Sequence, residues 1–344
     1  MKTTVPFLDS QRAITDSAAD ILVNDFFIKG QATAIYQALS LPLTKIGEIE
    51  NSEIKDFFYT YKPKPLWYDD KKIERGQSFF YKQALPIMTL LGALSLPYCY
   101  AASPGNKALY LSEKMRKATH KRLLDTAEFI IGVCSPNSFE KEGTGYFFIN
   151  KIRLIHAIAR YHILNGQAWN EKWGAPINQE DMAGTNLAFS FLIIKGMKQG
   201  GYDVSDRETS CFLYLWKYIG YQLHLDEDLL PNSYLEAIEL EKAIRLRHFK
   251  PSKEGKILTA EIVAYYKTIV PNQAAANLME AQIRYLLGSF VADCVGLSAN
   301  TVKDALVKTV NTVRKNTLFL THKTPSYEQM LSNQKMLKTK MGLD

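Results

Sequence analysis

Along most of the chain, hydrophobic residues recur at intervals of three or four positions, which is the spacing of one face of an α-helix. The alternating pattern of a β-strand is scarce, and no repeat or linker divides the sequence. The predicted helices span residues 13–25, 30–40, 51–59, 70–82, 85–101, 107–117, 119–134, 144–165, 179–199, 206–223, 232–246, 257–268, 273–288 and 299–315. We therefore predict an all-α fold: a single multi-helix domain over residues 1–344, globin-like in helix packing, with a basic C-terminal tail at 325–344.

Several helix ends carry capping signals. The stretch "NQED" places acidic residues in the first turn of the helix that follows it. Asp206 precedes another helical run, and Asn232 or Ser233 is available to cap the next one. Gly200 and Gly201 are expected to end a helix, because glycine tolerates the backbone conformation found there.

One segment, residues 84–102, has no charged side chain and is long enough to suggest a membrane span. It contains Pro86 and Pro97, which interrupt a regular helix, and amphipathic segments surround it. We therefore predict a buried helix or the wall of a pocket, and no membrane span.

The amino acid composition excludes few classes of function. The chain has 42 Lys and Arg against 35 Asp and Glu, and hydrophobic residues make up 47% of it, enough for a sizeable core. No zinc-finger, RNP or basic-zipper pattern accompanies the net charge of +7, so we expect a solvated basic surface and no nucleic acid partner. Nothing in the sequence indicates the oligomeric state.

The cysteines and the first twenty residues bear on the compartment. The cysteines, widely separated, are Cys99, Cys134, Cys211 and Cys294. They form no C-x-x-C or C-x-x-C-H motif, which disfavours a thiolate zinc site and covalently attached haem and fits a reducing compartment. The N-terminal stretch has neither the apolar core of a secretion signal nor a twin arginine, so we expect a cytoplasmic protein.

The stretch "KIRLIHAIARYHIL" (151–164) places a histidine within an apolar helical run. One stripe of this helix, expected to face the core, consists of Ile152, Ile155, Ala159 and Ile163. His156 lies at the edge of the stripe, and Arg153 and Arg160 lie beyond it on the same flank. The pattern alone leaves two interpretations of His156: a hydrogen-bonded core residue or a metal ligand.

Most other chemistry is excluded by missing motifs. No Glu-x-x-His pair, HExxH, Walker A loop, GxGxxG or GxSxG occurs, and "HLDE" (224–227) is more typical of a solvated loop than of a metal cluster. A single histidine can still be the protein's strong ligand when a porphyrin holds the metal.

Two neighbouring stretches, "TGYFFINKIRLIHAIARYHIL" and "WGAPINQEDMAGTNLAFS", together resemble the rubber-oxygenase catalytic-domain family, which includes latex clearing protein and an ER-bound oxygenase. The combination R-x-x-H-A-x-x-R followed by W-G-x-P-x-N-x-x-D-M is the specific part. The stretches at 65–80, 121–130 and 218–231 belong to the same resemblance, which covers roughly residues 15–320.

The resemblance implies an all-α fold that encloses one non-covalent haem b, with His156 as the proximal iron ligand. It also implies an oxygenase (an oxidoreductase) that uses O2 to oxidise or cleave an apolar small-molecule substrate, isoprenoid or lipid-like. Segment 84–102 would then wall the substrate channel. The alternatives are a haem protein that binds or senses without turnover, and an apolar-ligand carrier that has lost haem.

The resemblance also suggests roles for other side chains. Arg122 and Thr126 match the family's distal Arg-x-x-Lys-Thr stretch and share a helix face, from which both can donate hydrogen bonds to dioxygen. Arg153 and Arg160 could hold the haem propionates. Further cofactor contacts are expected from Phe148, Ile152, Thr185 and Phe189. Each of these residues also has an ordinary interpretation as a surface or core side chain.

The chain departs from the family pattern at two distal positions. Asp125 stands where the family has lysine, so a lysine-capped closed state is not expected. Asn106 lies near the place of the family's distal glutamate, and Glu113 is the nearest acid. These departures weaken the inference of alkene cleavage and leave the inference of haem binding unchanged.

Overall fold

The helical pattern predicted from the sequence is confirmed by the structure, a computed structural model that describes residues 3–112, 119–141, 143–166, 168–269, 272–299 and four single positions after them. Within these residues there is no strand, only an isolated bridge between Ala102 and Phe249. The fold class is therefore all-α, as predicted. The predicted helix at 299–315 and the tail at 325–344 lie almost wholly outside the described residues.

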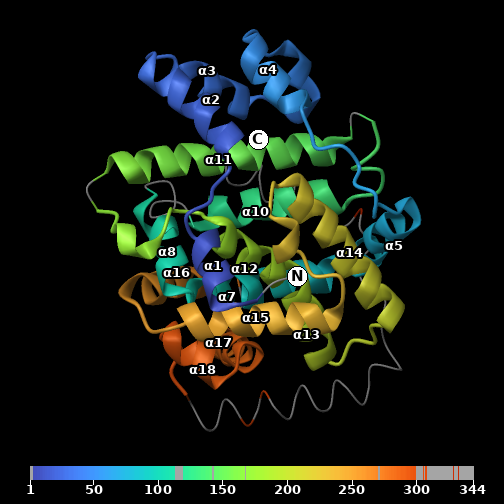
Figure 1. Ribbon diagram of the computed structural model, residues 1–344. Coiled ribbons are helices and arrows are strands. Elements are labelled where there is room, and N and C mark those ends of the chain that lie inside the picture. The colour runs from blue at the N-terminus through green and yellow to red at the C-terminus, as the bar shows by residue number, and fades with distance from the viewer. Residues whose placement is uncertain are drawn as a thin grey trace.

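The described chain consists of helices joined by loops (Figure 1). In chain order they are α1 (Val5–Gln11), α2 (Ser17–Ile28), α3 (Ala32–Ser40), η1 (Leu43–Glu48), α4 (Ser52–Tyr59), α5 (Asp70–Lys82), α6 (Ala84–Leu90), the π-helix η2 (Leu91–Ser95), α7 (Leu96–Tyr100), α8 (Ser103–Leu111), α10 (Thr119–Cys134), α11 (Thr144–Asn165), η3 (Glu171–Trp173), α12 (Gln179–Phe189), α13 (Phe191–Gln199), α14 (Asp206–Gln222), η4 (Glu227–Leu229), α15 (Tyr234–His248), α16 (Lys253–Ile269), α17 (Gln273–Leu287) and α18 (Ser289–Cys294).

The capping signals are largely correct. The Asn178 side chain accepts a hydrogen bond from the Asp181 backbone N at 3.0 Å, and Ser233 caps α15. Asp206 is the first residue of α14, and the cap lies one position earlier, where Ser205 forms a reciprocal capping box with Glu208.

Two predicted helices are interrupted. The one at 179–199 breaks at Ser190, whose backbone leaves the helical region (φ −116°, ψ −81°) and whose Oγ donates to the Asn186 carbonyl at 2.7 Å. The one at 85–101 contains the π-helix η2 between α6 and α7. The short helices α1 and α18 were not predicted, because they are too short to show a period.

Two hydrophobic clusters flank α11. Figure 1 shows α2, α3 and α4 packed on one side of α11 and most other helices on the other. The smaller cluster joins Val23 and Phe26 of α2 and Phe58 of α4 to Leu154 and Ala157 of α11. The larger cluster fills the space between the remaining helices. As a result α11 is covered on two faces.

This double coverage corrects the predicted core stripe of α11. Ile155, placed in that stripe, is 38% exposed. Arg153 and Arg160, placed on the flank, are each only 3% exposed. The sequence pattern of α11 could not show this, because the partners of both arginines come from α2.

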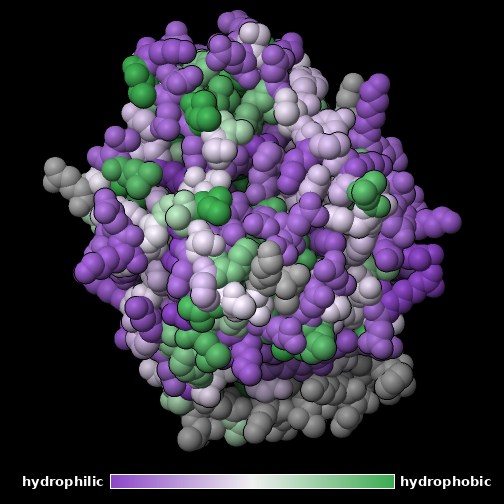
Figure 2. Space-filling model, viewed as in Figure 1, coloured by the Kyte–Doolittle hydropathy of each residue, from purple (hydrophilic) through white to green (hydrophobic). Residues whose placement is uncertain are grey.

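The apolar segment 84–102 lies in the main core, as the buried interpretation predicted. Leu91 and Leu94 are 4% and 1% exposed, and Leu94 packs against Gly196 of α13. In the described part of the chain no single helix is long and apolar enough to cross a membrane; only the pair 70–82 and 84–100 passes by length and composition, with a bend of 82°. The face in Figure 2 is mostly hydrophilic with scattered hydrophobic patches.

Candidate functional site

His156 lies near the middle of α11 and lines a small cavity between α11, the start of α2, α12 and the end of α14. The apolar lining of this cavity comes from Ile177, Met182, Leu223 and Leu225. Its polar lining comes from Thr15, Asp16, Gln179 and the two arginines of the motif. The volume of this cavity is about 10 Å³, which is room for about one water molecule and far less than the volume of a small-molecule site.

The surroundings of His156 keep its imidazole neutral. Burial and, to a smaller extent, the charge of Arg160 lower its pKa to about 4, while Asp16 acts in the opposite direction. A neutral imidazole is the form that binds a metal ion. His156 therefore has both the protonation state and the apolar wall that a metal ligand requires.

The two arginines beside His156 form ion pairs with α2. Arg153 donates from Nε and Nη2 to the Asp16 carboxylate at 2.6 and 3.0 Å, and from Nη1 to Asn150 at 2.9 Å. Arg160 donates from Nε to Asp20 at 2.7 Å, while its buried Nη2 has no hydrogen-bond partner among the described residues. Arg160 thus keeps one donor for a ligand, and the three donor nitrogens of Arg153 are all engaged.

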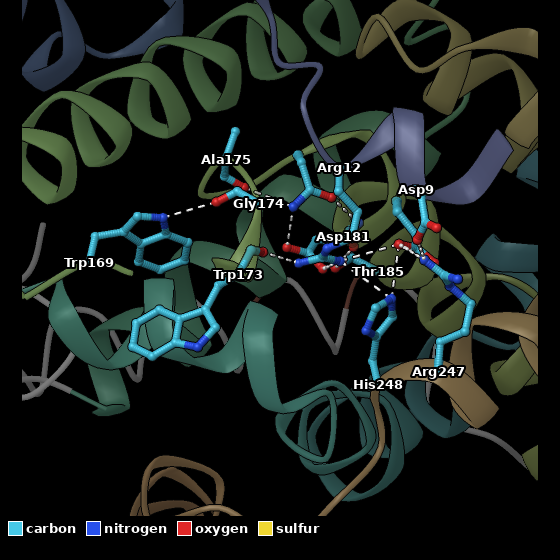
Figure 3. Close-up of polar contacts among 12 residues, drawn as sticks. Asp9, Arg12, Trp169, Trp173, Gly174, Ala175, Asp181, Thr185, Arg247 and His248 are labelled. Carbon is cyan, nitrogen blue, oxygen red and sulfur yellow. Dashed lines mark hydrogen bonds and ion pairs between the residues drawn. The ribbon is translucent and has the colours of Figure 1, made fainter. Parts of the chain in front are cut away.

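The W-G-x-P-x-N-x-x-D-M stretch, which leads into α12, contacts Arg12 near the N-terminus. The Arg12 guanidinium donates to Asp181 at 3.1 Å and to the Trp173 carbonyl, and the Arg12 carbonyl accepts from the Ala175 backbone N at 2.8 Å (Figure 3). Gly174 has φ +78°, and a Cβ there would approach the Arg12 carbonyl to 2.8 Å, so glycine is required. The motif is therefore a docking loop for the N-terminal segment.

A buried carboxylate completes this network. Glu180, with no exposed surface, accepts from Arg12 at 3.2 Å, from Arg247 at 2.8 Å and interacts with His248 at 2.9 Å. Burial acts to raise the pKa of Glu180, but the bonds from His248 and Arg247 outweigh it and hold that pKa below its ordinary value. Burial raises the pKa of Asp181, against the influence of Arg12. We interpret this network as structural, because it fastens α1 and α15 to α12.

The predicted distal residues lie on α10, the helix that packs along α11. Arg122 donates from Nη2 to the Tyr100 hydroxyl, while its buried Nε and Nη1 have no hydrogen-bond partner in the described ranges. Thr126, one turn later, is half-buried. Asp125, at the family's lysine position, is exposed to solvent.

The four expected cofactor contacts lie in different surroundings. Phe148 and Ile152 of α11 are partly buried against the main core, and the Phe148 ring lies directly against Gly132 of α10. Thr185 hydrogen-bonds to the Asp181 carbonyl at 3.0 Å, and it acts to lower the pKa of the Cys99 thiol against the larger effect of burial. Phe189 packs edge-on against the Trp216 ring at 5.7 Å. Their contact with a cofactor stays a prediction.

The structure describes some of the remaining candidate residues and not others. Asn106 is fully buried; its amide nitrogen donates to the Tyr100 carbonyl at 2.6 Å, and its Oδ1 has no partner among the described residues. Glu113 lies outside the described residues. In "HLDE", Asp226 caps η4, and no group of three or more His, Cys, Asp or Glu in the described part of the chain could hold a metal ion.

Sequence reasoning missed most of the cavity wall. Asp16 and Leu223 line the cavity with His156 from segments far apart in the sequence, and no local pattern signals that they meet. Met182 could have been found, because it stands three residues before Thr185 on the same face of α12. Residues 84–102, proposed as a channel wall, do not line this cavity.

Comparisons with known proteins place these features in context. The sequence model of the family described as "ER-bound oxygenase mpaB/B'/Rubber oxygenase, catalytic domain" matches residues 84–315. The rubber oxygenase of Streptomyces sp. (strain K30) is 24% identical over 260 residues, which cover 75% of this chain and 63% of that protein. This chain thus spans less than two thirds of that relative's length.

A solved structure supports the same fold. The latex clearing protein LCP in its closed state matches with a TM-score of 0.73, covering 94% of this chain and 88% of that one at 20% identity. Identity this low shows a shared fold and nothing more. The family match, however, covers well over half of the residues. The chain therefore belongs to the family of ER-bound oxygenases and rubber oxygenases, whose catalytic domain it contains.

Proposed function

We propose that this chain is a b-type haem-dependent oxygenase that uses O2 to oxidise or cleave an apolar substrate, isoprenoid or lipid-like. The observation that carries the proposal is His156, a neutral imidazole on the wall of a cavity and on the helix with the R-x-x-H-A-x-x-R motif. Membership of an oxygenase family supports the reaction class, and similarity to a rubber oxygenase supports an isoprenoid substrate.

The chemistry of the donor set fits a haem. The neutral imidazole of His156 suits ferrous or ferric iron, and the unpaired Nη2 of Arg160 suits a propionate carboxylate. A tetrapyrrole is far larger than the cavity of about 10 Å³ beside His156, so binding requires the helices around the cavity to separate. When bound, haem would supply the O2 chemistry that amino acid side chains lack.

The chain's own residues would orient the reactants. His156 would hold the iron from the α11 side, and its low pKa keeps the nitrogen unprotonated at neutral pH. Arg122 has two buried nitrogens available to donate to dioxygen, and Thr126 lies one turn away on the same helix. The apolar side chains around His156 would limit the access of water.

Oxygen consumption tests the proposed reaction. The haem-loaded protein is incubated with a series of polyprenyl compounds while dissolved O2 and carbonyl products are measured. The proposal predicts O2 uptake that depends on the prenyl substrate and yields aldehyde or ketone products. O2 uptake equal to the substrate-free rate across the series would contradict it.

A second candidate function is a haem protein that binds or senses a gas without turnover. Two observations favour it: Asp125 is exposed at the family's lysine position, and the buried Asn106 amide cannot act as a base. This candidate predicts reversible O2 binding with no substrate-dependent consumption, so the same experiment separates the two.

A further inference from the structure

We propose that Tyr100 is the positioning residue of the distal site: it holds Arg122 so that two of its nitrogens remain available to a ligand. This inference rests on the proposed function for the identity of the ligand. The contact between Tyr100 and Arg122, however, is a property of the polypeptide and can be tested without haem.

Tyr100 contacts the guanidinium in two ways. Its hydroxyl accepts a hydrogen bond from Nη2, and its ring lies under the guanidinium with 5.1 Å between Cζ and the ring centroid. Tyr100 is 1% exposed, so water cannot replace this contact. Burial raises the pKa of its hydroxyl, which therefore stays neutral.

The same residue also anchors the second distal position. The Tyr100 carbonyl accepts from the Asn106 amide nitrogen at 2.6 Å, and that nitrogen also donates to Ser252 at 2.9 Å. Tyr100 thus contacts both Arg122 and Asn106. In the described part of the chain, three buried polar atoms of these two residues have no hydrogen-bond partner: Nε and Nη1 of Arg122 and Oδ1 of Asn106. Buried polar groups are normally satisfied, so atoms left open in this way point to a ligand or to ordered water.

The neighbouring helices connect this group to the cavity beside His156. The Thr185 side chain lies near the thiol of Cys99, next to Tyr100, and acts to lower the pKa that burial of this thiol raises. Thr185 stands one turn beyond Met182 on α12, and Met182 lines the cavity of His156. Helix α12 thus contacts both the cavity beside His156 and the helix that carries Tyr100.

The first experiment replaces the hydroxyl alone. In Tyr100→Phe, the ring remains and Arg122 loses its acceptor. The Arg122 Nε–H signal, assigned by its absence in Arg122→Lys, is followed by NMR in the haem-free protein. We expect it to shift and to exchange with solvent at least about tenfold faster, because the guanidinium loses the buried hydrogen bond at Nη2 that holds it in place.

The matched control is Tyr98→Phe. Tyr98 is on the same short helix, is 8% exposed, and donates to Glu241, which keeps its bond to Arg245 at 2.8 Å. This variant loses a comparable buried hydroxyl but should leave the Arg122 signal unchanged. An Arg122 signal that is the same in Tyr100→Phe and in the wild type would overturn the assignment of Tyr100.

A second readout addresses the ligand side. In the reduced, haem-loaded protein with carbon monoxide, a hydrogen-bond donor near the ligand lowers the C–O stretching frequency. Tyr100→Phe should raise this frequency in the same direction as Arg122→Met, whereas Tyr98→Phe should not. A shift in Arg122→Met alone would remove the positioning role of Tyr100. A protein that binds no haem would refute the proposed function, and the NMR result would still decide the role of Tyr100.

Discussion

The ion pairs that hold α11 against α2 differ in burial, and this difference makes a quantitative prediction. Arg153 and Asp16 make two bonds, and their side chains are 4% and 10% exposed. Arg160 and Asp20 make one bond, and Asp20 is 22% exposed. Replacing each aspartate by asparagine removes one charge and keeps the side-chain shape.

The expected magnitudes follow from this geometry. Removing one partner of a buried pair costs about 3–5 kcal/mol, because the other charge is left uncompensated. Asp16→Asn keeps an oxygen that can accept from Arg153 and cap Ala19, so we expect the lower limit, about 3 kcal/mol. Asp20→Asn loses one bond at a wetter site, and we expect about 1 kcal/mol.

Urea unfolding at neutral pH measures both values, with each protein at the same haem content because a bound cofactor adds stability. The difference for Asp16→Asn should close in acid. Burial acts to raise the pKa of Asp16, but the bond and charge of Arg153 outweigh it and hold that pKa below the ordinary 3.8. The contribution of Asp16 is thus complete above pH 3.8 and is lost as pH falls through the lower, folded value. Equal losses for the two variants, or a loss for Asp16→Asn that does not change with pH, would refute this reasoning.

Two further predictions concern pH and packing. Burial lowers the pKa of His224 from 6.5 to about 4, so the unfolded chain binds a proton in this range that the folded chain does not; stability should rise with pH between 4 and 6.5. In His224→Asn, which suits the positive φ of 62°, urea midpoints should depend less on pH in this window, and an unchanged slope would contradict the prediction. A Cβ at Gly132 would lie 2.0 Å from the Phe148 ring, so Gly132→Ala should cost about 1–3 kcal/mol through overpacking. Gly184→Ala in α12, where the nearest atom is 3.5 Å away, is the matched control and should be neutral or stabilising; equal thermal midpoints for the two alanine variants would argue against the packing of Phe148 on Gly132.

The helices and the motif histidine could be predicted because both depend on local information. Period, capping residues and the R-x-x-H-A-x-x-R spacing are all contained within a few turns of chain. The break at Ser190 was missed, because a serine within an apolar run does not interrupt the hydrophobic period. The π-helix at 91–95 was missed for the same reason.

The surroundings of His156 depended on contacts that local patterns do not encode. Arg153 looked like a flank residue, because its partner Asp16 stands 137 positions away. Likewise, the spacing of the W-G-x-P-x-N-x-x-D-M stretch does not show its structural role. That role depends on the hydrogen bond from Arg12 to Asp181, and Arg12 is distant in the sequence. The apolar segment 84–102 could not be divided into core and channel wall from hydropathy alone, since both are apolar.

The central claim is that His156 holds a haem, and the haem content of purified variants tests it most directly. Wild type, His156→Ala and His224→Asn are supplied with haem, and the amount bound per chain is measured together with the Soret absorption and the far-ultraviolet circular dichroism. His224 is the matched control, because burial lowers its pKa to about 4 as it does for His156. We expect one haem per chain in wild type and in His224→Asn, and no haem in a folded His156→Ala. Full haem content in His156→Ala, or none in the wild type, would contradict the assignment of His156 as the haem ligand.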